Sequence, residues 1–322
     1  YLQTLKPEGN PTNGIQQIHT TTTDSDTCLG KGGMGIVTLG TQEYPNRTVA
    51  IKKIIKDSRT YHHMLLQEAQ IMGQLEHPNT VPVHQICLND DNELMVVMKK
   101  VNGQTLDAKL RDLDTNNIHE KIHLIQILIQ VCYALEYAHS RNIVHRDIKC
   151  ENIMIGHFNE VFLMDWGLAF NIETKEGAHT GVVGTPSYIA PEMLSGLPSD
   201  VTFQTDVYLL GATLHHILMN APRHNKSNVA EALESALHSH AFDFGNTIPT
   251  TFASIINQAC AKEIHHRYQS VTEFRESLDE ALHHWEAIQV TERARKLFDS
   301  LKDSIDNQAP SLEIQSLFMK CR

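Results

Sequence analysis

The chain has 322 residues, of which 41% are hydrophobic, 20% charged and 6% aromatic. This length exceeds one average domain, and the composition excludes a collagen-like, coiled-coil or fully disordered chain. Because 38 acidic residues outweigh 27 basic ones, the net charge of −11 gives no general electrostatic reason to bind nucleic acid or an anionic membrane. We therefore expect a folded enzyme or a large binding domain without a nucleic-acid partner.

Six cysteines lie at positions 28, 87, 132, 150, 260 and 321, too far apart for a C-x-x-C pair or a zinc-knuckle spacing. This spacing indicates a reducing compartment, so we expect a cytoplasmic location. The apolar run from Val207 to Met219 is interrupted by His215 and His216, and nothing else approaches the length of a membrane span. The chain starts at Tyr1 without a signal-peptide pattern, which suggests a piece of a longer chain and leaves a membrane anchor outside it open.

Residues 1 to 25 are rich in Thr, Gly, Asn, Pro and Gln and lack apolar periodicity, which predicts a flexible N-terminal segment. From Cys28 to Met98, short β-branched runs alternate with Gly, Pro and Asn, and this pattern predicts a small sheet. One helix is expected within it, between Tyr61 and Glu76, because apolar residues recur there at helical spacing.

After Gly103 the apolar spacing lengthens, which predicts a helical remainder. The expected helices cover residues 118 to 139, 204 to 219, 226 to 240, 250 to 261 and 271 to 305. A β-rich third followed by helices favours two lobes over a regular alternation of strands and helices. We therefore expect an α+β fold, with a small β-rich N-lobe over about 26–101 and a larger, mainly helical C-lobe over about 102–285.

A glycine-rich stretch places Gly30, Gly32 and Gly35 in the pattern G-x-G-x-x-G. Glycines let backbone N–H groups approach phosphate oxygens, but the pattern alone is weak evidence. A dinucleotide-binding loop would open a helix and meet an acidic residue about twenty positions later. Here a strand is expected instead, and Lys52 ends the strand-like run Val49-Ala50-Ile51-Lys52. This order favours a nucleoside triphosphate over a nicotinamide cofactor.

Glu68 falls inside the apolar stripe of the first expected helix. A carboxylate that faces a core needs a partner. Lys52, on a neighbouring strand, is the expected one, and the ion pair would hold its ammonium where the α- and β-phosphates should lie. The alternative is that Glu68 is a helix-surface residue whose stem covers apolar surface.

Charged residues lie between two apolar runs around Asp147, and Asn152 follows five positions later. Asp165 comes directly after another apolar run, thirteen positions beyond Asn152. Oxygen donors at Asn152 and Asp165 suit Mg²⁺, which prefers a few hard ligands and lets substrate phosphates complete its shell. Asp147 can orient an incoming hydroxyl group and accept its proton.

The patterns H-R-D-x-K-x-x-N, D-x-G, A-P-E and G-x-G-x-x-G-x-V occur in the order and spacing of the protein kinase family. Over about residues 26 to 285 the chain resembles a bacterial, eukaryotic-like Ser/Thr protein kinase. The resemblance implies transfer of the γ-phosphoryl group of ATP, with Mg²⁺ or alternatively Mn²⁺, to Ser or Thr hydroxyls of protein substrates, and autophosphorylation. Residues 286–322 would form a helical C-terminal extension that leads to further sequence.

Carried over onto this sequence, the resemblance makes Asp147 the catalytic base and gives Lys149 the task of neutralising the transferring phosphoryl group. Asn152 and Asp165 would hold the metal ions. The phosphates of ATP would be covered by Gly30, Gly32 and Gly35 and bound by Lys52, which Glu68 holds. The adenine site would be formed by Leu29, Val37, Ala50, Met98, Val101 and Met154.

The resemblance also implies an activation segment over residues 165 to 192, with Thr185 in the substrate-facing turn. Lys149 together with Thr185 resembles Ser/Thr kinases rather than tyrosine kinases. Asp206 would brace the catalytic loop, and Glu192 with Arg267 would form a buried structural pair.

Arg146, directly before the expected base, implies regulation, because in the family this arginine is a buried cation that awaits a phosphate on the activation segment. Thr174 and Thr180 are the candidate phosphorylation sites. The alternative is that both threonines are solvated loop residues.

Trp166 stands where the family usually has Phe and should remain a large apolar plug, with His145 packed beneath it. Cys150 replaces a common Pro, and we expect an inert rather than a reactive thiol. Two rival functions remain open, a pseudokinase or ATP-binding scaffold and a kinase of small molecules. The protein substrates, the activating signal and the oligomeric state cannot be read from the sequence.

Overall fold

The computed structural model describes residues 27–32, 35–42, 46–55, 59–89, 93–113 and 117–306. The expected N-terminal segment at residues 1–25 lies outside them, as do residues 307–322. The chain divides into two compact units, residues 1–275 and 276–322, and the first contains a β-sheet region followed by a mainly helical region. This confirms the α+β fold class expected from the sequence.

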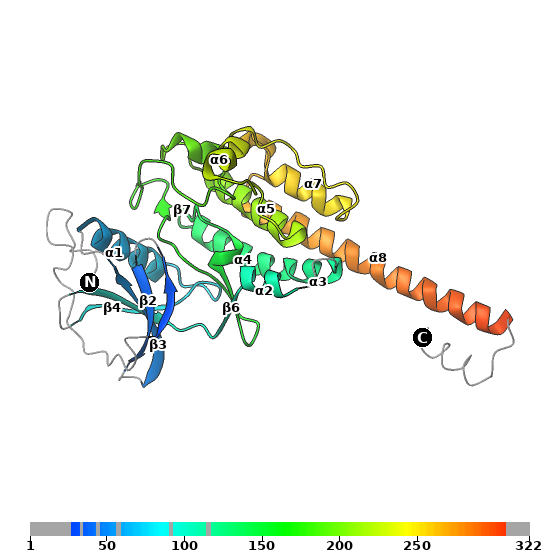
Figure 1. The fold of residues 1–322 in the computed structure, drawn as a ribbon, viewed down its shortest axis with the longest axis horizontal. Helices are drawn as coiled ribbons and strands as arrows, with labels where there is room; N and C mark the ends of the chain where they lie inside the picture. Colours follow the sequence, from blue (N-terminus) through cyan, green and yellow to red (C-terminus); the bar gives the residue numbers. More distant parts are fainter. Residues whose placement is uncertain are drawn as a thin grey trace. The chain divides into compact units, whose positions relative to one another are not determined.

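The N-terminal region is a five-stranded antiparallel sheet in the order β1-β2-β3-β5-β4 (Figure 1). The strands are β1 (Cys28–Lys31), β2 (Gly35–Gln42), β3 (Arg47–Ile54), β4 (Val83–Leu88) and β5 (Leu94–Lys99). One buried cluster is formed by Val49 and Ile51 on β3, Met95 and Val97 on β5 and Cys87 on the edge strand β4. The two pairs are spaced by two residues, as the alternation of side chains along a strand requires. The sheet therefore presents β3, with Lys52, beside a rigid apolar layer.

Helix α1 (Arg59–Gln74) packs against β3, β4 and β5. It begins and ends two residues earlier than the sequence pattern predicted. Its buried face includes Leu65, Ala69, Met72 and the carboxylate-bearing Glu68. The expectation that Glu68 lies on the apolar face is therefore confirmed.

The helical region contains α2 (Leu106–Asp112), α3 (Ile118–His123), α4 (Ile125–His139), α5 (Phe203–Met219), α6 (Val229–His238), α7 (Thr250–Ala259) and α8 (Val271–Asp306). Helix α5 is almost wholly buried and packs against α4 and α7. Helix α8 runs without a break through position 286, where the sequence suggested that an extension begins. No helix in the described part of the chain is both long enough and apolar enough to cross a membrane.

The single helix expected over residues 118–139 is wrong, because the structure breaks it at Leu124 into α3 and α4. The Leu124 N–H is shared between the carbonyls of Glu120 and Lys121, at 3.3 and 3.1 Å. Such sharing tightens the last turn of a helix. No Pro or Gly marks the break, so the apolar periodicity runs across it undisturbed.

Two short pairings bring the chemistry-bearing loops together. Strand β7 (Ile143–Val144) pairs with β10 (Phe170–Asn171), and β8 (Ile153–Gly156) pairs with β6 (Gly103–Thr105) and β9 (Val161–Leu163). Residues 145–152 therefore leave β7 and enter β8, while residues 164–169 leave β9 and enter β10. Since both ends of one loop pair with both ends of the other, the two loops lie side by side.

Candidate active site

The Asp147 carboxylate is the centre of a compact hydrogen-bond network. It accepts from the Lys149 ammonium at 2.7 Å, the Asn152 amide at 2.9 Å and the Thr185 hydroxyl at 2.7 Å. Lys149 also donates to the Thr185 hydroxyl at 2.6 Å. Asp147 is only 7% exposed, so its position is set before any ligand arrives. Two residues of the same motif, Lys149 and Asn152, and Thr185 from a distant part of the chain thus meet around one carboxylate.

Asp206 on α5 holds the backbone of this loop. Its carboxylate accepts from the backbone N–H groups of His145 and Arg146, both at 2.9 Å, and lies 2.8 Å from Nε2 of His139. Burial alone would raise the pKa of Asp206, but the hydrogen bond and charge of His139 outweigh it and hold the pKa below its usual value. These contacts to the backbone of the loop are the ones that the expected bracing role of Asp206 requires.

Lys52 and Glu68 form the ion pair expected from the sequence. The Lys52 ammonium lies 2.6 and 2.7 Å from the two Glu68 oxygens and 3.5 Å from the Asp165 carboxylate. The Glu68 side chain is 5% exposed, which excludes the surface-residue alternative. Burial would lower the pKa of Lys52, but the two carboxylates raise it above the usual value and keep the ammonium charged.

Asp165 differs from the other acidic groups because its side chain is 49% exposed. Its backbone is in the left-handed region at φ 58°. Burial raises its pKa, but the charge of Lys52 and of nearby basic groups outweighs this, so the pKa lies below its usual value. An ionised, accessible carboxylate beside Lys52 has the chemistry needed to hold a cation.

Among the described glycines of the loop, Gly35 is at a position where the structure requires glycine. A Cβ on Gly35 would lie 2.4 Å from the carbonyl oxygen of Lys53, whereas one on Gly30 would meet nothing within 4 Å. Gly32 donates its N–H to the carbonyl of Gly35 at 2.9 Å, which closes the hairpin. Packing within the protein therefore does not require glycine at positions 30 and 32, as expected for glycines that allow a ligand to approach the backbone.

The residues expected around adenine lie on neighbouring strands. Ala50 pairs with Met98 across β3 and β5, and both are 6% exposed. Leu29 on β1 is 44% exposed, and Val37 on β2 is partly buried. Val101, after β5, and Met154, on β8, are also partly buried. Strands β1, β2, β3 and β5 are contiguous in the sheet, so Leu29, Val37, Ala50 and Met98 lie on neighbouring strands.

His145 and Trp166 pack as the sequence suggested. Their ring centroids are 4.5 Å apart in an edge-on arrangement, and Trp166 is 1% exposed. The indole N–H donates to the carbonyl of Leu163 at 3.3 Å, so the buried donor is satisfied. The bulkier Trp166 therefore fits the core without a lost hydrogen bond.

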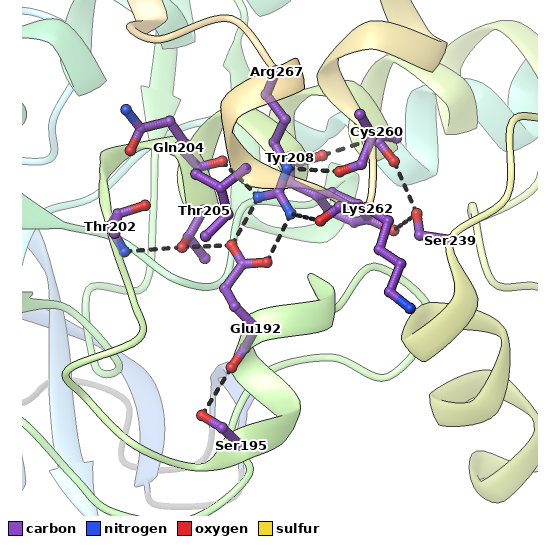
Figure 2. Close-up of polar contacts among 12 residues, drawn as sticks. Glu192, Ser195, Thr202, Gln204, Thr205, Tyr208, Ser239, Cys260, Lys262 and Arg267 are labelled. Carbon is purple, nitrogen blue, oxygen red and sulfur yellow. Dashed lines mark hydrogen bonds and ion pairs between the residues drawn. The ribbon is translucent and has the colours of Figure 1, made fainter.

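The end of the expected activation segment is pinned by Glu192 and Arg267 (Figure 2). The guanidinium donates to both carboxylate oxygens of Glu192, at 2.7 and 2.8 Å, and to the carbonyl of Gln204 at 3.0 Å. Thr205 adds a hydroxyl donor to Glu192 at 2.7 Å. Arg267 is 2% exposed, so this is a buried two-pronged pair of the kind that Lys could not reproduce.

Arg146 is buried at 3% exposure, and its Nε and Nη1 have no hydrogen-bond partner among the residues that the structure describes. Its guanidinium lies 5.0 Å from the centre of the Phe170 ring. Thr174 and Thr180 are both exposed, and within the described residues no hydrogen bond joins either hydroxyl to Arg146. The structure thus leaves Arg146 lacking an anion but does not bring the two threonines to it.

Sequence reasoning missed His139 and Thr205. His139 contacts Asp206 from the last turn of α4, and Thr205 bonds both Glu192 and the backbone of Thr202. Their only sequence signals are a histidine at a helix end and a threonine next to Asp206, which are too common to be distinctive. Both act on charged groups that were themselves predicted.

The chain matches the protein kinase domain model over residues 24–285, and it therefore belongs to the protein kinase family. This is the family to which the sequence motifs pointed, and the resemblance is confirmed. Members of the family use ATP and a divalent metal ion.

Among curated proteins, the chain is similar to bacterial enzymes named serine/threonine-protein kinase PknD. It is 32% identical over 285 residues to the one from Chlamydia felis, which covers 79% of this chain and 30% of the relative. It is also 32% identical over 292 residues to the one from Protochlamydia amoebophila, over 79% of this chain and 29% of the relative. The chain thus spans less than a third of the length of these relatives.

Proposed function

We propose that this chain is the kinase part of a bacterial Ser/Thr protein kinase, which transfers the γ-phosphoryl group of ATP to Ser and Thr hydroxyls of proteins, including its own. The observation that carries the proposal is the Asp147 carboxylate, which accepts a hydrogen bond from the Thr185 hydroxyl while Lys149 lies 2.7 Å away. The same base can accept the proton of a substrate hydroxyl, and Lys149 can offset negative charge on the transferred group.

We propose that ATP is bound by Lys52, fixed by Glu68, beneath the turn of Gly30, Gly32 and Gly35. A nearly buried ammonium that stays charged is a strong ligand for phosphate oxygens. The adenine ring would lie among the apolar side chains of Leu29, Val37, Ala50, Met98, Val101 and Met154.

Asn152 and Asp165 fit a hard divalent cation, which we propose to be Mg²⁺, with Mn²⁺ as a substitute. The Asn152 amide nitrogen is used by Asp147, which leaves the amide oxygen as the atom for a cation. Asp165 is ionised and accessible. The bound ion would neutralise phosphate charge and orient the triphosphate.

We propose that the kinase domain spans about residues 26–285, with the N-lobe ending near 101 and residues 286–322 forming an extension. The kinase model match over 24–285 supports these bounds.

We also propose that the protein works in the reducing cytoplasm. Cys87, Cys150 and Cys260 are free and buried, and burial raises the pKa of each thiol, to about 11 for Cys87, so they are inert.

The proposed function is tested by incubating the purified chain with Mg·ATP and a generic protein substrate and measuring phosphate incorporation by mass spectrometry. Phosphate on Ser and Thr of the chain and of the substrate is expected. Asp147→Asn should lower the rate on the order of 10²-fold or more while the protein stays folded, because the base is lost. Asp112→Asn, at an exposed carboxylate on α2, is the control and should keep full activity.

Nucleotide binding without phosphate transfer in the wild-type chain would contradict the proposal and would instead indicate an ATP-binding scaffold. Phosphorylation of small molecules but not of proteins would likewise overturn the substrate class.

A further inference from the structure

A cavity of about 500 Å³ lies between α6 and the loop that joins α5 to α6. Its walls include the basic residues Arg223 and Lys226 and the histidines His224, His238 and His240. None of the catalytic or nucleotide-binding residues proposed above lines it. The cavity therefore needs an explanation of its own.

Arg223 is the unusual group in this cavity. It is only 8% exposed, and in the described part of the chain its Nε has no hydrogen-bond partner. One guanidinium nitrogen donates to the carbonyl of His240 at 2.6 Å, and the ring of Phe242 lies 5.6 Å away. No carboxylate of the described residues lies within ion-pair distance of it. A buried guanidinium without an anion is costly, and an anionic ligand would remove that cost.

The groups around Arg223 do not supply the missing charge. Burial and the charge of Arg223 lower the pKa of both His215 and His224 to about 4, so these histidines are neutral near pH 7. Glu231 lies on the outer wall of the cavity, but Ser227 and Asn228 each donate a hydrogen bond to its carboxylate at 2.7 Å. Glu234 also lines the outer wall and is exposed. The buried charged residue of the lining, Arg223, is therefore positive, whereas Lys226, Glu231 and Glu234 are exposed.

Hydrogen bonds fix two residues that line the cavity, His224 and Ser239. The Tyr208 hydroxyl lies 2.9 Å from Nε2 of His224 and 2.8 Å from the Ser239 hydroxyl, which donates to the carbonyl of Cys260 at 2.8 Å. Tyr208, Ser239 and Cys260 are drawn in Figure 2, close to the Glu192–Arg267 pair. A preformed site of this kind binds without a large ordering cost.

The cavity is also tied to the substrate-facing turn. The backbone N–H of His224 donates to the carbonyl of Ser187 at 2.9 Å, and Ser187 lies two residues after Thr185. Helix α6 packs against the helical turn η3 (Pro191–Ser195), which begins four residues after Ser187. A peptide that places its hydroxyl near Asp147 and Thr185 would thus have the cavity within reach of its neighbouring residues.

We propose that the Arg223 cavity is a docking subsite for an anionic side chain of the protein substrate, either a carboxylate or a phosphate on Ser or Thr. The buried cation without a counter-ion identifies the chemistry of the ligand, and the link to Ser187 identifies it as part of the substrate. This inference rests on the proposed kinase activity and adds a substrate preference to it.

The test uses a series of fluorescent peptides with one central Ser, in which three Glu residues are moved stepwise along the sequence on either side, beside an all-Gln parent. Dissociation constants are measured by fluorescence anisotropy without nucleotide, and kcat and KM with Mg·ATP. For at least one Glu position, the wild type should bind about tenfold more tightly than to the Gln parent, the size of a charge-assisted hydrogen bond. A phosphoserine version of the best peptide distinguishes carboxylate from phosphate as the preferred ligand.

Arg223→Met should abolish this preference by raising KM for the acidic peptide, with kcat and the values for the Gln parent unchanged. Arg223→Lys keeps the charge and should retain part of the preference. It therefore separates loss of the cation from a general folding defect. Arg141→Met, at an exposed arginine on the same lobe, is the matched control and should behave as wild type.

Equal binding of Glu and Gln peptides by the wild type, or a preference that survives Arg223→Met, would overturn the subsite while leaving the kinase activity intact. Stabilisation of the wild type by inorganic phosphate without any peptide preference would also overturn it, because the site would then serve a free anion. Absence of phosphate transfer with intact peptide discrimination would instead overturn the proposed function and spare the subsite.

Discussion

At the scale of single residues, three charged groups of the site, those of Asp147, Lys52 and Asp206, each have several defined partners. Asp147 is surrounded by three donors, Lys52 by two carboxylates, and Asp206 by two backbone N–H groups and His139. Partners of opposite charge offset the loss of hydration on burial. Removing one member of such a set therefore costs more than the contact itself, since the other member stays buried without its counter-ion.

The Lys52–Glu68 pair tests this directly. Lys52→Met leaves the 5% exposed Glu68 carboxylate without its main partner, so the free energy of unfolding should fall by about 3–5 kcal/mol. Lys52→Met combined with Glu68→Leu should recover most of that loss, as measured by urea unfolding. The exposed Arg111–Asp107 pair on α2 is the control, and its cycle should give less than about 1 kcal/mol. A double variant less stable than Lys52→Met would contradict this account.

At the scale of elements, strand and helix place different demands on glycine. In β2, a side chain on Gly35 would meet the backbone of β3 at 2.4 Å, whereas Gly73 in α1 faces open space. Close packing means that Gly35 cannot be replaced by a larger residue without strain. Gly73 has no such constraint, and glycine there costs conformational entropy when the helix forms.

Gly35→Ala should therefore lower the free energy of unfolding by about 1–3 kcal/mol. Gly73→Ala should raise it by about 0.5–1 kcal/mol, because alanine loses less entropy in a helix. Thermal and urea unfolding of the two variants measure both effects. An unchanged stability of Gly35→Ala would show that β2 and β3 can separate at no cost.

Helix α5 contains a titratable group that makes stability depend on pH. Burial, the charge of Arg223 and the neighbouring His216 and His224 lower the pKa of His215 to about 4, with the Ala221 carbonyl acting in the opposite direction. The unfolded chain has an ordinary histidine pKa of about 6.5 and binds more protons below it. The stability contributed by neutral His215 is therefore complete above about pH 6.5 and is lost as the pH falls towards 4.

His215→Phe should flatten this dependence. Between pH 6.5 and 4, the unfolding free energy of the variant should fall less steeply than that of the wild type, by up to about 1.4 kcal/mol per pH unit. Urea unfolding at a series of pH values measures the slope. His123→Phe, at an exposed histidine of α3, should leave the slope unchanged. Parallel curves for wild type and His215→Phe would contradict the assignment.

At the scale of the whole molecule, Arg146 connects the loop that carries Asp147 with the expected activation segment, because its guanidinium lies 5.0 Å from the centre of the Phe170 ring. Its guanidinium is buried beside Phe170 and lacks partners for two nitrogens, while Thr174 and Thr180 are exposed on the same segment. A phosphate offers several strong acceptors and a double negative charge, which such a cation can bind. We propose that phosphorylation of Thr180, or of Thr174, draws the segment onto Arg146 and aligns the site.

Mass spectrometry of active protein should then find phosphate on Thr180 or Thr174. Thr180→Ala or Thr174→Ala, whichever removes the site found, should lower kcat several-fold, and the other variant serves as its control. Arg146→Met should also have low activity, and phosphate on the threonine should not restore it, because that variant lacks the phosphate-binding cation. Active protein without phosphate between Asp165 and Thr185 would defeat this hypothesis.

The sequence by itself determined the family, the two-region α+β fold and most of the charged groups of the site. It could do so because these groups occur at short, characteristic spacings, and because Glu68 within an apolar stripe requires a cation that Lys52 can supply. The break of the helix at Leu124 escaped prediction, because it leaves the apolar periodicity unchanged.

Only the tertiary structure decided which residues, distant in the sequence, become partners of a charged group. His139 and Thr205 gain their roles from Asp206 and Glu192, which they meet through folding and not through spacing. Arg223 is an ordinary basic residue in the sequence, and only the packing of α6 shows it to be buried without a carboxylate. Local patterns record what each segment tends to form, whereas burial and pairing depend on which segments pack together.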